Sequence, residues 1–110
     1  MLQYEVNFLT GAKKDMLEIA NYISNELYSP ESAMRLIDKF KKAVNSLTTL
    51  PERYPVHESD TVKTIFRKML VGNYLIFYIV KGKNVYIAFV IHKKQDFDIV
   101  LSTFKMNTEI

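Results

Sequence analysis

The sequence predicts a two-layer α+β fold in a single domain over residues 1–110, and three observations support it. Two apolar runs, residues 74–80 and 85–91, are rich in β-branched and aromatic residues and flank a short segment that contains Gly82, as in a β-hairpin. Between residues 11 and 47, two segments carry apolar residues at helical spacing. A length of 110 residues suits one domain with one core.

A strand and a helical hairpin are expected first. Residues 2–9 partly alternate between apolar and polar side chains, which predicts a half-buried strand. Thr10 is the expected N-cap of a first amphipathic helix. Ser29 is the expected N-cap of a second, with Pro30 at its first position, and Pro51 ends that helix.

An ordered loop over residues 51–62 is expected to lead into a three-stranded antiparallel meander, followed by a possible short helix over residues 97–104. The expected strands are residues 63–71, 74–80 and 85–91. A helical hairpin returns the chain to the end of the sheet that it left. The strand over residues 63–71 should therefore run antiparallel to the first strand.

Strict alternation, with Gly82 and Lys83 as a two-residue turn, gives the hairpin two apolar faces. The first face would hold Tyr74, Ile76, Tyr78, Val80, Val85, Ile87, Phe89 and Ile91. The second face would hold Leu75, Phe77, Ile79, Tyr86, Ala88 and Val90. A three-residue loop would exchange the faces of the second run, but both faces stay apolar in either register. The two helices can cover only one face, so the short terminal segment and a partner protein are expected to cover the other.

Composition narrows the class of protein. The chain has no cysteine, which excludes a disulfide framework and a thiolate metal site. No signal peptide is visible and the longest apolar run has seven residues, so we expect a cytoplasmic protein without a membrane span. Residues 1–62 carry a net charge of −2 and residues 63–110 of +5. The basic half suits an acidic partner, although lysines that keep sheet edges soluble would explain it equally well.

RNA cleavage without metal needs a base, an acid and cations that hold phosphate. His92 is a candidate acid or base, and Glu52 or Glu58 a candidate base. The candidate phosphate contacts are Lys68, Lys93 and Lys94. For His92 we favour a structural hydrogen bond to the backbone or to Asp96. Because His92 and Asp96 have no further ligands nearby, we expect no metal and no cofactor.

Arg67 is the most informative single residue. It falls in the middle of an expected strand, on the face of Tyr78 and between apolar neighbours, where a charge is costly unless it is paired. We favour an ion pair with a carboxylate of the helices or the loop over contact with an anion or a partner. Lys68 lies on the opposite face and is the better contact candidate. Of the seven tyrosines, Tyr54, in a loop bounded by prolines, is the one that we expect to be exposed.

The element order, read with four segments, resembles the RelE/ParE family of toxins from type II toxin–antitoxin modules. The segments are Ala12–Ile23, Leu50–Pro55, Arg67–Tyr78 and Val90–Asp96. The ParE branch is the closer match, through Arg67, the strand over residues 73–78, and the pair His92 and Asp96. That resemblance implies a growth-inhibiting toxin of a plasmid-stabilisation type of module. Such a toxin binds and inhibits DNA gyrase, is not an enzyme, and is neutralised by a cognate antitoxin.

The RelE branch supplies the alternative function, a ribosome-dependent endonuclease that cuts mRNA. Members of that branch use basic side chains on the sheet face away from the helices. One catalytic arginine commonly lies three residues before the tyrosine that matches Tyr78, and Leu75 stands there in this chain, which weakens the nuclease hypothesis. The candidate contacts with target or antitoxin are Arg53, Tyr54, Arg67, Lys68, Leu75, Phe77, Tyr86, His92, Lys93, Lys94 and Asp96.

Overall fold

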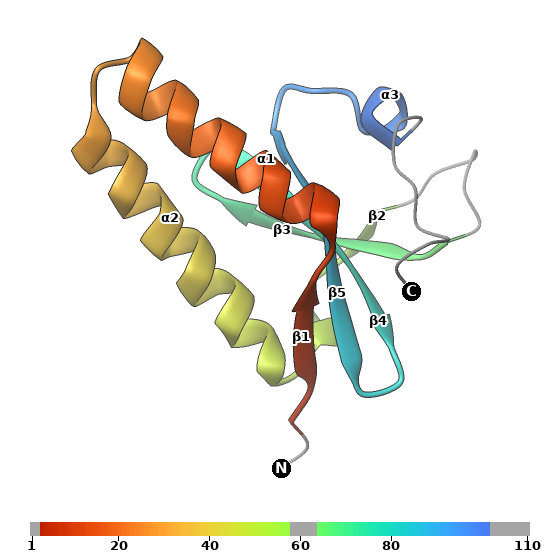
Figure 1. The fold of residues 1–110 in the computed structure, drawn as a ribbon. Helices are drawn as coiled ribbons and strands as arrows, with labels where there is room; N and C mark the ends of the chain where they lie inside the picture. The colour runs from red at the N-terminus through yellow and green to blue at the C-terminus, as the bar shows by residue number, and fades with distance from the viewer. Residues whose placement is uncertain (1–2, 58–63, 102–110) are drawn as a thin grey trace.

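The computed structural model describes residues 3–57 and 64–101 and confirms the α+β class (Figure 1). One sheet has the strand order β1-β5-β4-β3-β2. The elements are β1 (Glu5–Phe8), α1 (Thr10–Asn21), the π-helical turn η1 (Tyr22–Glu26), α2 (Pro30–Asn45), the 3₁₀ turns η2 (Ser46–Thr48) and η3 (Pro51–Arg53), β2 (Val56–His57), β3 (Phe66–Val71), β4 (Tyr74–Lys81), β5 (Asn84–His92) and α3 (Phe97–Leu101).

The helix starts differ in one respect from the expectation. Ser29 and Pro30 take the N-cap and first positions of α2, as predicted. Thr10, however, is already the first residue of α1, and Leu9 occupies the N-cap without a side-chain hydrogen bond. Leu9 is buried among residues of the sheet, so the chain leaves β1 there in an extended conformation and turns directly into the helix.

The helical hairpin covers one face of the sheet, as Figure 1 shows. This helix-side core joins apolar residues of α1, α2 and η2 to alternate residues of the strands. Its fully or almost fully buried members include Met16, Phe40, Val44, Leu47, Met69, Ile76, Tyr78, Val85 and Ile87. Residues Tyr4, Val6 and Phe8 also pack against it, which agrees with the alternation of the first strand.

The direction of β3 corrects the expectation. β1 pairs in parallel with β5, whereas β4 is antiparallel to both β3 and β5. β3 therefore runs in the same direction as β1, not against it. The cause is β2, a two-residue strand within the expected loop, which is antiparallel to β3. The chain does return from the helical hairpin antiparallel to β1, but in β2, and it reverses once more before β3.

The turn at residues 82–83 was predicted correctly, but the hairpin register changes further along. Val80 lies opposite Val85, as expected. Tyr78 then lies opposite Ile87. The next residue toward the start of β4, Phe77, lies opposite Phe89, so the intervening residue of β5 is the extra residue of a β-bulge.

This bulge reverses the faces of the last part of β5. Phe89 and Ile91, expected on the helix side, belong to the core cluster on the far side of the sheet. Val90, expected on the far side, belongs to the helix-side core. Strict alternation failed because one extra residue shifts every following side chain to the opposite face.

α3, shown in blue in Figure 1, covers part of the far face of the sheet. Phe97 is 7% exposed and its ring contacts those of Phe66, Phe77 and Phe89. Val100 and Leu101 pack against the same cluster, as predicted, whereas the predicted burial of residue 104 lies outside the described residues. No helix among the described residues is long and apolar enough to cross a membrane.

The expectation of a wide apolar surface open to a partner is therefore corrected. Phe77 and Ala88 were expected to need a partner's cover, but both are fully buried in the chain alone. Leu75 and Tyr86 are partly buried. Among the described residues expected on that face of the strands, Leu70 stays largely open, with 61% of its surface exposed.

Candidate functional site

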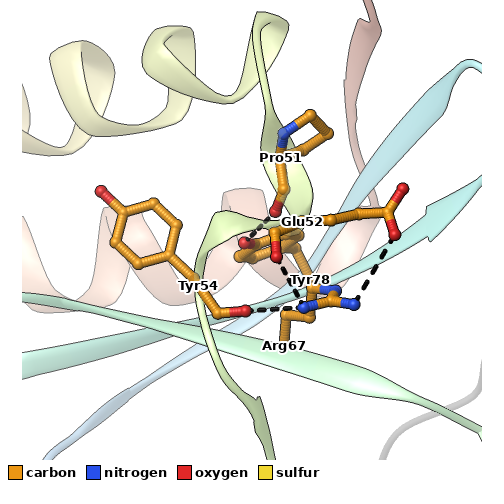
Figure 2. Close-up of polar contacts among 5 residues, drawn as sticks. All are labelled: Pro51, Glu52, Tyr54, Arg67 and Tyr78. Atoms are coloured by element: carbon orange, nitrogen blue, oxygen red, sulfur yellow. Dashed lines mark hydrogen bonds and ion pairs between the residues drawn. The ribbon is translucent and has the colours of Figure 1, made fainter.

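A polar cluster holds the loop before β2 against β3 (Figure 2). Arg67 lies opposite Tyr78 on the helix side of the sheet. Its Nη1 donates hydrogen bonds to the carbonyl oxygens of Glu52 at 2.9 Å and Tyr54 at 2.7 Å. Its Nη2 lies 3.8 Å from Oε2 of Glu52. The expected ion pair with the loop is present, but the shorter contacts of Arg67 are to the backbone.

Tyr78 of β4 also holds the same loop in place. Its hydroxyl donates a 2.6 Å hydrogen bond to the carbonyl oxygen of Pro51. The side chain is fully buried, and burial raises the pKa of Tyr78 to about 12 against the weaker opposing effect of Arg67. At neutral pH the phenol is therefore a constant donor, and with Arg67 it sets the position of residues 51–54.

Arg53 also acts within the fold. Its Nη1 donates to the carbonyl oxygens of Thr49 at 2.6 Å and Leu50 at 3.0 Å, at the end of the segment that follows α2. Its guanidinium carbon lies 4.8 Å from the ring centroid of Tyr54. Tyr54 is partly buried against the helix-side core, so the expectation that this tyrosine is exposed is wrong. Tyr28, at the tip of the helical hairpin, is 88% exposed.

A second cluster lies on the far face of the sheet, where Lys68 projects. The Nζ of Lys68 is 3.3 Å from Nδ1 of His57. The imidazole packs against Phe97 with a centroid distance of 4.1 Å, and edge-on against Phe77 at 5.4 Å. Burial, together with the charge of Lys68, lowers the pKa of His57, while Asp98 opposes that shift.

Sequence reasoning missed this pairing of His57 with Lys68. His57 falls within residues 51–62, which were expected to form a loop, because a two-residue strand such as β2 leaves no periodic pattern. The pairing of β2 with β3 is what brings His57 beside Lys68. The neighbouring candidates on this face differ in access: Phe77 is buried, and Leu75 and Tyr86 are partly exposed.

The turn after β5 holds the last group of candidates. The N–H of Lys94 donates to Nδ1 of His92 at 3.2 Å, and the N–H of His92 donates to Oε1 of Gln95 at 2.7 Å. The favoured structural hydrogen bond of His92 to the backbone is confirmed. Asp96 instead accepts a 2.8 Å hydrogen bond from the N–H of Asp98 and so caps α3. Lys93 and Lys94 are exposed.

The structure does not gather the five candidate nuclease residues that it describes. Glu52 is held at Arg67, opposite Tyr78, whereas His92 lies opposite Tyr74. Tyr74 and Tyr78 are four residue steps apart along β4, about 13 Å at the usual rise of a strand. Lys68 lies on the other face. An acid and a base must both reach the reacting group, and this set does not.

One absence concerns the described residues alone. Within residues 3–57 and 64–101, no three acidic, histidine or cysteine side chains lie together as metal ligands. Residue 58, the other candidate base, lies outside these ranges. The arrangement thus offers a loop held by hydrogen bonds from Arg67 and Tyr78, an exposed pair of lysines and a partly covered sheet face, which are features of a binding surface.

Three comparisons relate the chain to known proteins. A family model described as the ParE toxin of type II toxin–antitoxin system parDE matches residues 6–97. The solved structure of a chromosomal ParDE system from P. aeruginosa is similar with a TM-score of 0.69 and 18% identity, over 84% of this chain and 98% of that one. The toxin–antitoxin complex RelBE2 from Mycobacterium tuberculosis is similar with a TM-score of 0.54 and 21% identity, over 86% and 97%. No curated protein matches the sequence.

Proposed function

This chain belongs to the ParE toxin family of type II toxin–antitoxin systems, and from that premise we propose that it inhibits DNA gyrase by binding to it. The observation that carries the choice of target is the match of the ParE family model to residues 6–97. The proposed site of action is the cytoplasm, where the gyrase is. When the toxin is produced without its antitoxin, the proposed result is arrest of cell growth.

The geometry supports an interaction protein over an enzyme. Residues that the nuclease hypothesis needs together lie on different faces and at different ends of the sheet. Leu75 occupies the position at which the RelE branch commonly carries a catalytic arginine. The most elaborate polar cluster, around Arg67 and Tyr78, is occupied by contacts within the chain.

We propose a cognate antitoxin as the second partner. Both similar solved structures carry titles of toxin–antitoxin systems. An acidic antitoxin segment that contacts Lys93, Lys94 and the exposed side chain of Leu70 would complement the basic half of the chain. A stable complex would bury about 1,000 Å² or more.

Inducible expression without antitoxin separates the two targets. The gyrase hypothesis expects a DNA-damage response, accumulation of gyrase–DNA cleavage complexes, and loss of supercoiling by purified gyrase. The variant His92→Gln should keep most of this toxicity, because His92 serves the turn after β5. Cleaved transcripts with normal gyrase activity, or a folded His92→Gln variant that binds antitoxin but is inert, would contradict the proposal.

One observation favours a second candidate function, the ribosome-dependent endonuclease. Lys68 and His57 are 3.3 Å apart on the face away from the helices, where the RelE branch carries its basic side chains. Under this hypothesis the double variant Lys68→Ala/His57→Gln would lose transcript cleavage on ribosomes. Under the gyrase hypothesis the parent protein does not cleave transcripts at all.

A further inference from the structure

A cavity lies between α1 and the end of β5, at the edge of the sheet where β1 stops. β1 pairs with β5 only as far as Ile87, and the wall of the cavity includes the next part of β5 together with residues of α1, η1, β4 and α3. Its volume is about 260 Å³. Sites for drug-sized ligands usually measure about 300–1,000 Å³, so this cavity suits a smaller group, such as one side chain.

The polar part of the wall is acidic and phenolic. It consists of two carboxyl groups, two phenols and one amide, from Asp15, Glu18, Tyr22, Tyr74 and Gln95. The other lining residues are apolar, and no described residue of the wall is a lysine or an arginine. The chain as a whole has a net charge of +3, so this cavity is an acidic site on a basic protein.

We propose that the cavity binds the guanidinium group of an arginine side chain from a protein partner. This proposal goes beyond inhibition of gyrase and does not depend on which target the chain inhibits. A guanidinium is planar, weakly hydrated and always charged, and it forms parallel hydrogen bonds to carboxylates and stacks on aromatic rings. Carboxyl groups beside tyrosine rings supply both kinds of contact.

Asp15 is the group that a bound cation would stabilise most. The residue is partly buried, and its Oδ2 accepts a 3.0 Å hydrogen bond from the N–H of Val90. A carboxylate offers about four acceptor positions, so this bond leaves capacity for a further donor. Burial raises the pKa of Asp15, although the hydrogen bond from Val90 opposes that effect. The charged carboxylate is therefore only partly compensated within the chain, and an incoming guanidinium would complete that compensation.

Glu18 and Tyr22 lie three and seven residues after Asp15, on the same face of the helix. Oε1 of Glu18 is 4.0 Å from Nζ of Lys14, and both side chains are largely exposed. Such a pair contributes little, so Glu18 can exchange Lys14 for a partner's cation at small cost. Tyr22 is 54% exposed and begins the π-helical turn η1. Turns of this kind are rare and frequently occur at functional sites.

Tyr74 is the fixed aromatic group of the wall. Its ring packs edge-on against Phe40 at 5.8 Å and His92 at 5.4 Å between centroids. Burial, and the nearby phenol of Tyr22, raise the pKa of Tyr74, so it stays neutral and available at physiological pH. The cavity thus combines one tyrosine held by packing with one that can adjust to a ligand.

The charges around the cavity define the partner segment further. Lys93 and Lys94 are exposed and precede Gln95 in the turn after β5, so they oppose the approach of an isolated cation. A partner segment that places acidic side chains against these lysines and an arginine in the cavity complements both charges.

Nuclear magnetic resonance with a capped arginine tests the cavity directly. The ¹⁵N-labelled full chain is titrated at neutral pH with N-acetyl-arginine methylamide, and the backbone amide of Val90 and the side-chain amide of Gln95 report binding. We expect saturable shifts with a dissociation constant on the order of 1 mM, because one side chain is a small ligand. The amide of Gly82, in the turn between β4 and β5, should not move.

Two further probes separate charge from shape. N-acetyl-citrulline methylamide has nearly the same shape as the capped arginine but no charge, and it should bind at least about tenfold more weakly. N-acetyl-lysine methylamide has the charge without the planar group, and it should bind about threefold more weakly. Free arginine, with its charged ends, should bind no more tightly than the capped form if the natural ligand is part of a protein chain.

Variants assign the binding to the cavity. Asp15→Asn keeps an oxygen for the N–H of Val90 but removes the charge, and it should weaken binding of the capped arginine at least about tenfold. Tyr22→Leu removes an aromatic ring from the wall and should weaken binding about threefold. Asp38→Asn is the matched control, because it removes one exposed carboxylate of α2, and it should bind the probe as the parent does.

Four outcomes overturn the proposal. The first is a titration in which the capped arginine causes no saturable shift of Val90. The second is equal binding of capped arginine, lysine and citrulline, and the third is unchanged binding in Asp15→Asn. The fourth is much tighter binding of free arginine, which would make the ligand a small molecule. Should Asp15→Asn fail to fold, Tyr22→Leu and the three capped probes decide.

Discussion

Replacing Arg67 with alanine tests whether this residue holds the loop over residues 51–54 against β3. The guanidinium donates to two backbone carbonyl oxygens, at 2.9 and 2.7 Å. A hydrogen bond that involves a charged group contributes about 1.5–3 kcal/mol. The ion pair adds little, below about 1 kcal/mol, because the side chain of Glu52 is 62% exposed and the atoms are 3.8 Å apart. Since contributions of neighbouring bonds overlap, we expect a loss of about 2–4 kcal/mol.

Thermal denaturation, followed by circular dichroism, measures this loss. The unfolding entropy is about 2.1 cal/mol/K per residue, so in a chain of 110 residues 1 kcal/mol corresponds to about 4 °C. Arg67→Ala should therefore lower the Tm by about 8–16 °C. Glu52→Gln is the matched control. It removes the carboxylate charge but keeps the backbone carbonyl oxygen that accepts from Arg67, and it should lower the Tm by less than about 4 °C.

Two results would refute this reasoning. If Arg67→Ala melts within about 2 °C of the parent, the hydrogen bonds to Glu52 and Tyr54 contribute nothing net. If Glu52→Gln is as harmful as Arg67→Ala, the ion pair dominates and the backbone contacts do not. Antitoxin binding, measured well below the Tm, should be close to that of the parent. A stable Arg67→Ala variant that no longer binds would make Arg67 a contact residue.

Three further predictions concern ionisation and surface charge. Tyr78 should ionise at about pH 12 in an ultraviolet titration, and the free energy of unfolding should fall as the pH rises from about 10. Burial raises the pKa of Asp15, so Asp15→Asn should match or exceed parental stability in urea at pH 7, an advantage that disappears below about pH 4. Lys93→Ala with Lys94→Ala should weaken antitoxin or target binding in a salt-dependent way, while the Tm changes by no more than about 2 °C.

The sequence sufficed for elements that a local pattern determines. The two helices followed from apolar residues at helical spacing and from the Ser29-Pro30 start. The hairpin turn followed from Gly82, whose φ of 61° suits glycine. β2 was missed because two residues show no period, and only its pairing with β3 defines it. The predicted direction of β3 was wrong for the same reason.

The candidate site was predictable only where a charged group in apolar surroundings required a polar partner. Arg67 had to find a partner because it lies among apolar neighbours, and it did. The main acceptors of Arg67 are backbone carbonyl oxygens, and the conformation of the loop places them there. This loop turns at Leu50, which has a φ of 45°. Leucine rarely adopts a left-handed conformation, so the residue type at position 50 does not predict this turn. The contact between His57 and Lys68 likewise exists only because β2 forms.

The bulge in β5 shows why a strand with two apolar faces has an ambiguous register. When both faces are apolar, either set of side chains can be buried, so the hydrophobic pattern does not choose between them. Polar groups then decide. β1 pairs with β5 only as far as Ile87, which leaves the outward N–H of Val90 without a strand partner. Asp15 of α1 accepts that N–H at 3.0 Å. A carboxylate on the first helix thus takes the place of a strand at the edge of β5, and it holds Val90 in the register that the bulge produces.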